Sequence, residues 1–242
     1  MKIKFHYTLL FFICLGLICG IYKKLLIIYT LIMFHELGHL LFIKIFKRKI
    51  NKITVLPFGG IIDYQNNDNM PLYQDFLING GGLLVNIILF FIFKDGLFRE
   101  YNIIIIAFNV LPIFPLDGGR LLEVSLCKIF RFKIVIVLLS ILSIIFIIFI
   151  FIYNFITLKA ISVYLIFLFL LFENIELYKE RRKKYQFFLL KKYLFPNMKL
   201  RRKRIKKIGN LTNYFHRGVN NVISLDNRTI EEQTILEKYF KR

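Results

Sequence analysis

The stretch LLIIYTLIMFHELGHLLFIKIF, residues 25–46, decides the fold of this chain. It is long enough to cross a bilayer as one helix, which takes about 20 apolar residues. Near its middle lies His35-Glu36-Leu37-Gly38-His39, an HExxH motif. Residues four apart share one helical face, so both imidazoles can reach one Zn²⁺, with Glu36 beside them as a base. Because polar groups are costly in hydrocarbon, this set predicts peptide hydrolysis inside a membrane.

Long apolar blocks also fill the chain on either side of this stretch. Hydrophobic residues make up 57% of the 242 residues, more than the interior of a soluble protein of this size can hold. The expected fold class is therefore an all-α polytopic membrane protein with about six transmembrane helices, a short re-entrant or β-hairpin loop and a small cytosolic C-terminal segment. The predicted spans are residues 5–21, 25–46, 73–93, 101–130, 134–155 and 160–177.

Prolines and glycines interrupt two of these regions. Pro112 and Pro115 fall inside residues 101–130, so we expect that span to kink or unwind. Residues 50–64 contain a proline and the Gly59-Gly60 pair and are too short for a spanning helix. We expect them to form the hairpin or re-entrant loop, which could offer a strand edge to an extended substrate peptide.

Positive charge is concentrated at the C-terminus. The net charge is +20, and residues 179–242 contribute +14 of it, from 19 Lys/Arg and 5 Asp/Glu. The positive-inside rule therefore predicts a cytoplasmic C-terminus. The lipid bilayer is an expected partner, and the basic tail could lie on anionic lipid. Such charge can also bind nucleic acid, but no nucleic acid is expected for a multi-pass membrane protein.

A catalytic zinc site needs a third protein ligand besides the two histidines, and an open position for water. The other histidines lie at the N-terminal edge and in the tail, so a carboxylate from another span is expected. Asp117 is the best candidate; it lies in NVLPIFPLDGG, residues 109–119. An acidic residue in an apolar bundle is a functional hypothesis by default. The alternative is a helix-end Asp117 paired with Arg120.

The HExxH motif and residues 109–119 together resemble the site-2 protease family of intramembrane zinc metalloproteases, which carries NxxPxPxLDGG in a later membrane helix. The resemblance covers the second to the fourth predicted span. It implies one Zn²⁺ per chain, bound by His35, His39 and Asp117, with Glu36 as the catalytic base. It also implies that residues 1–178 are the protease domain.

Four other residues are expected to position the substrate: Asn109, Pro112, Gly59 and Gly60. The amide of Asn109 could hold the substrate backbone. The alternative for Asn109 is an interhelical hydrogen bond.

Further features are similar to a sporulation branch of the family. These are the six-span layout, the loop at residues 54–60, the short tail and the lack of room for a PDZ domain between the motifs. That branch cleaves a membrane-tethered sigma factor precursor, pro-sigma-K. The resemblance implies the membrane around the forespore, membrane inhibitor proteins as partners, and a tail related to the ATP-binding CBS domain. Residues 179–242 are too short for a CBS pair, so a reduced CBS-like unit is expected.

Two other functions stay open. The protease could cleave an anti-sigma factor or remnant signal peptides. The chain could instead be a zinc-binding transporter or a non-catalytic scaffold. A transporter usually shows polar residues in several spans and repeat symmetry, whereas here they concentrate at two motifs. An inactive relative would be expected to lack Glu36 or Asp117, and both are present.

Overall fold

The computed structural model describes residues 2–5, 18, 20, 22–56, 59–64, 70–157, 161–196, 200–206, 211–225 and 228–241. The chain divides into two compact units. The first comprises residues 1–65 and 77–111, and the second comprises residues 66–76 and 112–242.

The first unit combines apolar helices with a small sheet. Its helices are α2 (Tyr22–Ile45), α3 from residue 77 onward (the whole helix is Leu72–Ile92) and α4 (Gly96–Val110). Strand β2 (Ile50–Leu56) pairs antiparallel with β3 (Gly59–Tyr64), which confirms the predicted hairpin. Strand β1 (Lys2–Phe5) joins β2 in parallel. Strand β1 is not among the predicted elements, although its polar and apolar residues alternate as a strand requires.

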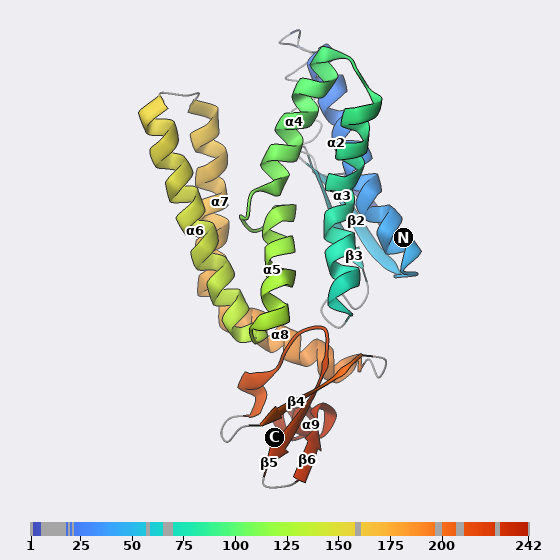
Figure 1. The fold of residues 1–242 in the computed structure, drawn as a ribbon, viewed down its shortest axis with the longest axis vertical. Coiled ribbons are helices and arrows are strands. Elements are labelled where there is room, and N and C mark those ends of the chain that lie inside the picture. Colours follow the sequence, from blue (N-terminus) through green and yellow to red (C-terminus); the bar gives the residue numbers. More distant parts are fainter. Residues whose placement is uncertain are drawn as a thin grey trace. The chain divides into compact units, whose positions relative to one another are not determined.

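The second unit continues with helices and ends in another small sheet. Its elements are α5 (Asp117–Ile129), α6 (Phe132–Thr157), α7 (Ile161–Lys179), α8 (Arg181–Leu194), β4 (Arg202–Lys206), the 3-10 helix η2 (Leu211–Tyr214), β5 (Asn220–Leu225), β6 (Arg228–Glu231) and α9 (Glu232–Phe240). Helices α6 and α7 lie side by side, and α8 follows α7 (Figure 1). Strand β5 pairs in parallel with β4 and antiparallel with β6.

Three of the described helices are long and apolar enough to cross a membrane: Tyr22–Ile45, Leu72–Ile92 and Phe132–Phe155. They coincide with the predicted spans 25–46, 73–93 and 134–155. The predicted span 160–177 falls on α7. Most of the predicted span 5–21 lies outside the described residues, so the total of six spans stays a prediction.

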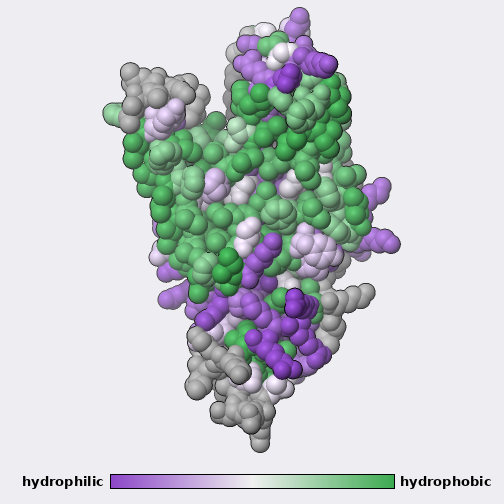
Figure 2. Space-filling view, in the orientation of Figure 1, coloured by the Kyte–Doolittle hydropathy of each residue, from purple (hydrophilic) through white to green (hydrophobic). Residues whose placement is uncertain are grey.

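Apolar side chains on these helices face outward. On α6, Phe149 is 65% exposed and Phe155 is 74% exposed. In Figure 2, hydrophobic side chains cover α6, whereas hydrophilic ones gather over the C-terminal segment. Exposed apolar surface on helices of this length is what a lipid-facing surface requires.

The predicted fold class needs one correction. The protein is mostly helical, as expected, but it is not all-α, because strands β4, β5 and β6 form a sheet in the C-terminal segment. The predicted span 101–130 is divided between helices α4 and α5, which confirms that the chain unwinds within it. Helix α4 begins earlier, because the Asp95 side chain accepts a hydrogen bond from the Phe98 N–H at 2.9 Å and caps the helix. The chain leaves helical structure between Val110 and Asp117, where the two prolines lie.

The C-terminal segment shares a hydrophobic core with the ends of the helices in the second unit. Its buried members come from α5, α6, α8, the loop before β5, β5 and α9: Cys127, Phe132, Val135, Ile136, Tyr185, Phe188, Leu189, Phe215, Ile223, Ile235 and Leu236. Burial raises the pKa of Tyr185. The predicted boundary at residue 178 and the CBS-like character of the tail stay predictions.

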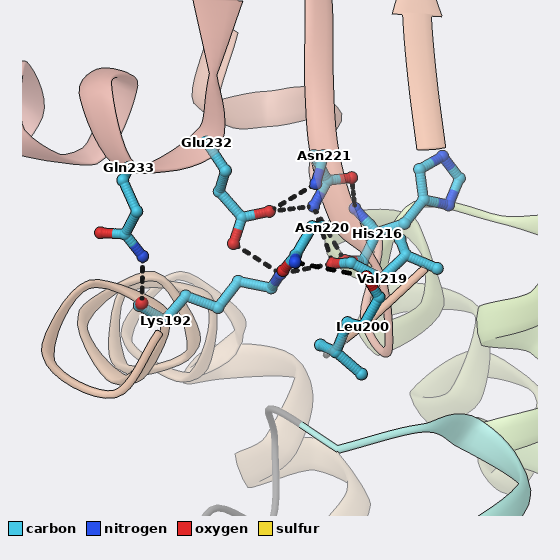
Figure 3. A network of polar contacts seen from close by, with 8 residues as sticks. All are labelled: Lys192, Leu200, His216, Val219, Asn220, Asn221, Glu232 and Gln233. Atoms are coloured by element: carbon cyan, nitrogen blue, oxygen red, sulfur yellow. Dashed lines mark hydrogen bonds and ion pairs between the residues drawn. The ribbon is translucent and has the colours of Figure 1, made fainter. Parts of the chain in front are cut away.

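A polar network fixes α8 to the C-terminal sheet (Figure 3). The Lys192 ammonium is fully buried, lies 2.7 Å from Glu232 and donates to the Val219 carbonyl at 2.8 Å. Asn221 donates to the other Glu232 oxygen from its backbone N–H and from its side chain. Burial lowers the pKa of Lys192, and the charge of Glu232 opposes that change. A buried charge persists only when it is paired in this way.

A second buried ion cluster joins the C-terminal segment to two helices of the same unit. Arg217 is 6% exposed and lies 2.7 Å from Asp75, near the start of α3. It also donates to Glu123 of α5 at 2.9 Å. Lys184 of α8 lies 3.8 Å from the other Glu123 oxygen. Two buried carboxylates are thus balanced by two cations.

We expect Arg217→Met to destabilise the protein by about 3–5 kcal/mol, because it leaves buried carboxylates without their main counter-charge. The matched control is Arg202→Met, whose ion pair with Glu231 spans 3.6 Å and is exposed. That change should cost about 0–1 kcal/mol. Thermal unfolding of both variants, followed by circular dichroism in detergent, measures the difference. Equal melting temperatures would show that the cluster does not stabilise the fold.

Candidate metal centre and active site

The two histidines of the HExxH motif lie one turn apart on α2. Their Nε2 atoms are 3.2 Å apart, and His35 is buried. Two nitrogens that bind one tetrahedral zinc at about 2.0–2.1 Å lie roughly 3.3–3.4 Å from each other. The pair therefore has the spacing of two ligands on the same zinc ion.

The ring of His39 is oriented by the backbone of α3. Its Nδ1 lies 2.7 Å from the carbonyl oxygen of Ile78, so Nδ1–H donates to that oxygen. The Nε2 atom then carries the lone pair that a metal ligand needs. Metal-binding histidines are commonly held by such a bond from the second ring nitrogen.

Glycines allow α3 to approach the histidines closely. A Cβ on Gly82 would lie 2.5 Å from the Nε2 of His35 and 2.6 Å from the Nε2 of His39. Gly38 and Gly81 bring the backbones of α2 and α3 together in the same way. The space beside the two ligand nitrogens therefore exists because residue 82 has no side chain.

The carboxylate of Glu36 meets the hairpin. The backbone N–H of Gly60 in β3 donates to the Glu36 Oε1 at 2.6 Å. A Cβ on Gly60 would lie 3.0 Å from the other carboxylate oxygen. The hairpin thus positions the side chain that the motif assigns as the base, and Gly60 is in contact with the candidate site.

Asp117 is the first residue of α5 and belongs to the second unit. The positive end of the helix dipole favours a charged carboxylate at this position. Two features fix the turn before it. Arg120 donates to the Pro115 carbonyl at 3.1 Å, and a Cβ on Gly119 would lie 2.5 Å from the Ile113 oxygen. The two glycines of the DGG sequence are buried, so α5 can begin in a tight turn.

The remaining predicted site residues are Asn109, Pro112 and Gly59. Asn109 is half-buried on α4, and its amide donates to the Ile105 carbonyl of the same helix at 3.1 Å. That bond lies within one helix, unlike the interhelical bond we considered. Pro112 is half-buried between α4 and α5. Gly59 begins β3.

The structure brings His35, His39, Glu36 and Gly60 together in the first unit. Two contributors to the site are not among the residues predicted from the sequence. The run Asn79-Gly80-Gly81-Gly82 is a visible signal for close helix packing, but it does not say which glycine meets the histidines. The Ile78 carbonyl is a backbone group, so no residue type marks it.

Comparisons with known proteins show which family the sequence resembles. Residues 23–98 match the model of peptidase family M50. The chain is 30% identical over 264 residues to stage IV sporulation protein FB of Bacillus subtilis, covering 99% of this chain and 92% of that relative. It is 31% identical over 118 residues to a zinc metalloprotease of Methanocaldococcus jannaschii, covering 43% of this chain and 34% of the relative.

A solved structure of a site-2 protease from Methanocaldococcus jannaschii is also similar. Its TM-score is 0.48 and its sequence is 22% identical. The similarity covers 75% of this chain and 89% of that one.

Proposed function

The chain belongs to peptidase family M50, the site-2 protease family of membrane zinc metalloproteases, and we propose that it hydrolyses a peptide bond within or next to a membrane segment of its substrate. The observation that carries this proposal is the histidine pair on α2, whose Nε2 atoms have the spacing of zinc ligands. Glu36 lies between the two histidines in the sequence, on the same apolar helix.

We propose that His35, His39 and Asp117 hold one zinc ion per chain. The histidine spacing, the Ile78 carbonyl behind His39 and the space beside Gly82 all fit such an ion. Asp117 would supply the carboxylate from α5. When bound, zinc polarises the scissile carbonyl and lowers the pKa of the attacking water.

Glu36 performs the proton transfers in this proposal. Its carboxylate accepts a proton from the attacking water and passes it to the leaving amine. The Gly60 N–H donates to one carboxylate oxygen and thereby orients the side chain for these proton transfers. A positioned base of this kind typically contributes about 10²–10⁴-fold to the rate.

The hairpin supplies a place for the substrate backbone. Strand β3 is at one end of the β1-β2-β3 order, and among the described strands it pairs only with β2. A substrate unwound to an extended strand could add to the edge of β3 that does not pair with β2. Gly59 and Gly60 would then lie beside the scissile region, and Asn109 and Pro112 would contact the substrate from the segment that precedes Asp117.

We further propose that the substrate is a membrane-tethered sigma factor precursor of the pro-sigma-K type. The nearly full-length similarity to a sporulation protein supports this choice. Cleavage of an anti-sigma factor or of remnant signal peptides is the alternative within the same chemistry. The +14 charge of residues 179–242 supports a cytoplasmic C-terminus in a bacterial membrane.

Asp117→Asn tests the metal site, because it keeps the shape of the side chain and weakens an anionic ligand. We expect zinc in the purified full-length protein to fall from about one per chain to well below half. Cleavage of a co-expressed pro-sigma-K-like substrate should fall with it. The matched control is Asp95→Asn, because Asn caps a helix as well as Asp does. Full zinc content in Asp117→Asn would exclude Asp117 as a ligand.

A further inference from the structure

Helix α8 turns away from α7, which falls on the predicted membrane span 160–177. Helix α7 packs against α6 and exposes Phe169 and Phe172. It ends at Lys179, and α8 begins at Arg181 after a single intervening residue. Figure 1 shows α8 running across the ends of α6 and α7 rather than continuing α7, and α8 contacts both of them. Because α7 falls on a predicted membrane span, we expect a helix that follows it in this way to start at the membrane surface.

One face of α8 is buried against the rest of the protein. Tyr185, Phe188, Leu189 and Lys192 are buried. The first three belong to the hydrophobic core of the second unit, and Lys192 binds Glu232. The opposite side of α8 therefore points away from the core of the second unit.

The opposite face carries an apolar stripe. Phe187, Leu190 and Leu194 recur at intervals of three and four residues, which places them along one side of a helix. Phe187 is 62% exposed and Leu194 is 55% exposed, while Leu190 is partly exposed. Phe195, just past the helix end, is 48% exposed. Water-exposed helix faces seldom carry such a stripe.

Basic residues accompany this stripe. The helix reads RRKKYQFFLLKKYL, with Lys and Arg at six of its 14 positions and no Asp or Glu. Arg182, Lys183 and Lys191 are exposed. Exposed Phe and Leu flanked by Lys and Arg are the signature of a helix that lies in the interfacial layer of a bilayer.

We propose that α8 is an interfacial helix that inserts Phe187, Leu190 and Leu194 among lipid headgroups and binds anionic phospholipid through Arg182, Lys183 and Lys191. The charge complementarity and the direct link to α7 both select the bilayer as the occupant of this face. Each basic residue at an anionic surface contributes roughly fivefold to partitioning. Helix α8 thereby holds the C-terminal segment against the membrane, because its other face is part of that segment's core.

The absence of tryptophan from the sequence makes the test specific. Phe187→Trp places a single fluorophore on the stripe of the full-length protein. The matched control is Tyr239→Trp on α9, where the side chain is 44% exposed. Both proteins are reconstituted in phosphatidylcholine vesicles, with and without phosphatidylglycerol. Quenching is measured with aqueous acrylamide and with phosphatidylcholine brominated on its acyl chains.

We expect Phe187→Trp to emit at shorter wavelength than Tyr239→Trp, to be quenched at least about threefold less by acrylamide, and to be quenched by brominated lipid. Phosphatidylglycerol should increase the lipid quenching. Adding Arg182→Gln and Lys183→Gln should remove most of that increase. Leu194→Trp repeats the measurement at a second site on the stripe, should Phe187→Trp fold poorly.

Two results would overturn the proposal. The first is equal acrylamide quenching on α8 and α9, with no quenching by brominated lipid, which would place the stripe in water. The second is protection from acrylamide without lipid quenching, which would show that protein rather than lipid covers the stripe.

Discussion

Glu36→Gln is expected to lower the rate of substrate cleavage by about 10²–10⁴-fold while the protein keeps its zinc. Glutamine has nearly the same shape as glutamate, and its amide oxygen can still accept the hydrogen bond from the Gly60 N–H. It cannot accept the proton of the attacking water. The two histidines are unchanged, so metal binding should be retained. Cleavage rates and zinc content of the purified full-length variant measure both properties.

The control for this prediction is Glu237→Gln, the same chemical change at an exposed position of α9. It should leave both the rate and the zinc content unchanged. Cleavage by Glu36→Gln at the parent rate would remove Glu36 from the mechanism. Loss of zinc together with activity would instead give Glu36 a role in building the metal site.

Gly82→Ala is expected to lower zinc affinity by about 100-fold or more, and activity with it. The new Cβ would lie 2.5 Å from the Nε2 of His35 and 2.6 Å from that of His39. Real Cβ atoms do not come closer than about 3.0 Å to such atoms, so at least one imidazole must move. Changes that only disturb the orientation of metal ligands already cost about 10–100-fold, and here the methyl group occupies space beside both ligand atoms.

The matched control is Gly96→Ala at the start of α4, where a Cβ would have no neighbour within 4 Å. Competition with a fluorescent zinc chelator gives the affinities of both variants. Added zinc should partly restore cleavage by Gly82→Ala, since the catalytic base is intact. Parent-like affinity in Gly82→Ala would mean that zinc does not bind on the Gly82 side of the histidines.

Much of the first unit follows from sequence because its signals are local. The HExxH spacing places both imidazoles on one helical face, and the structure shows their Nε2 atoms 3.2 Å apart. The hairpin follows from glycine and proline between short apolar segments, and it is present as β2 and β3. Residues 25–46 and α2 differ by only a few residues at the N-terminal end.

The features that sequence did not predict depend on contacts distant in the chain. Strand β1 is short, and its partner β2 lies more than 40 residues away. The tail is rich in Lys and Arg, so its sequence does not show the apolar pattern that predicts a strand at β4. In the structure, Arg204 and Ile205 of β4 pair with Val222 and Ile223 of β5. The Arg217 cluster joins residues from four separate parts of the sequence. None of these pairings has a local pattern to reveal it.

The central claim is that two histidine nitrogens and a carboxylate oxygen hold one zinc ion beside Glu36. X-ray absorption at the zinc edge of the purified full-length protein tests it most directly. The account predicts about one zinc per chain, with histidine nitrogens at about 2.0–2.1 Å, oxygen ligands at about 2.0–2.2 Å and no sulfur. A thiolate sulfur at about 2.3 Å, or active protein that contains no zinc, would contradict it.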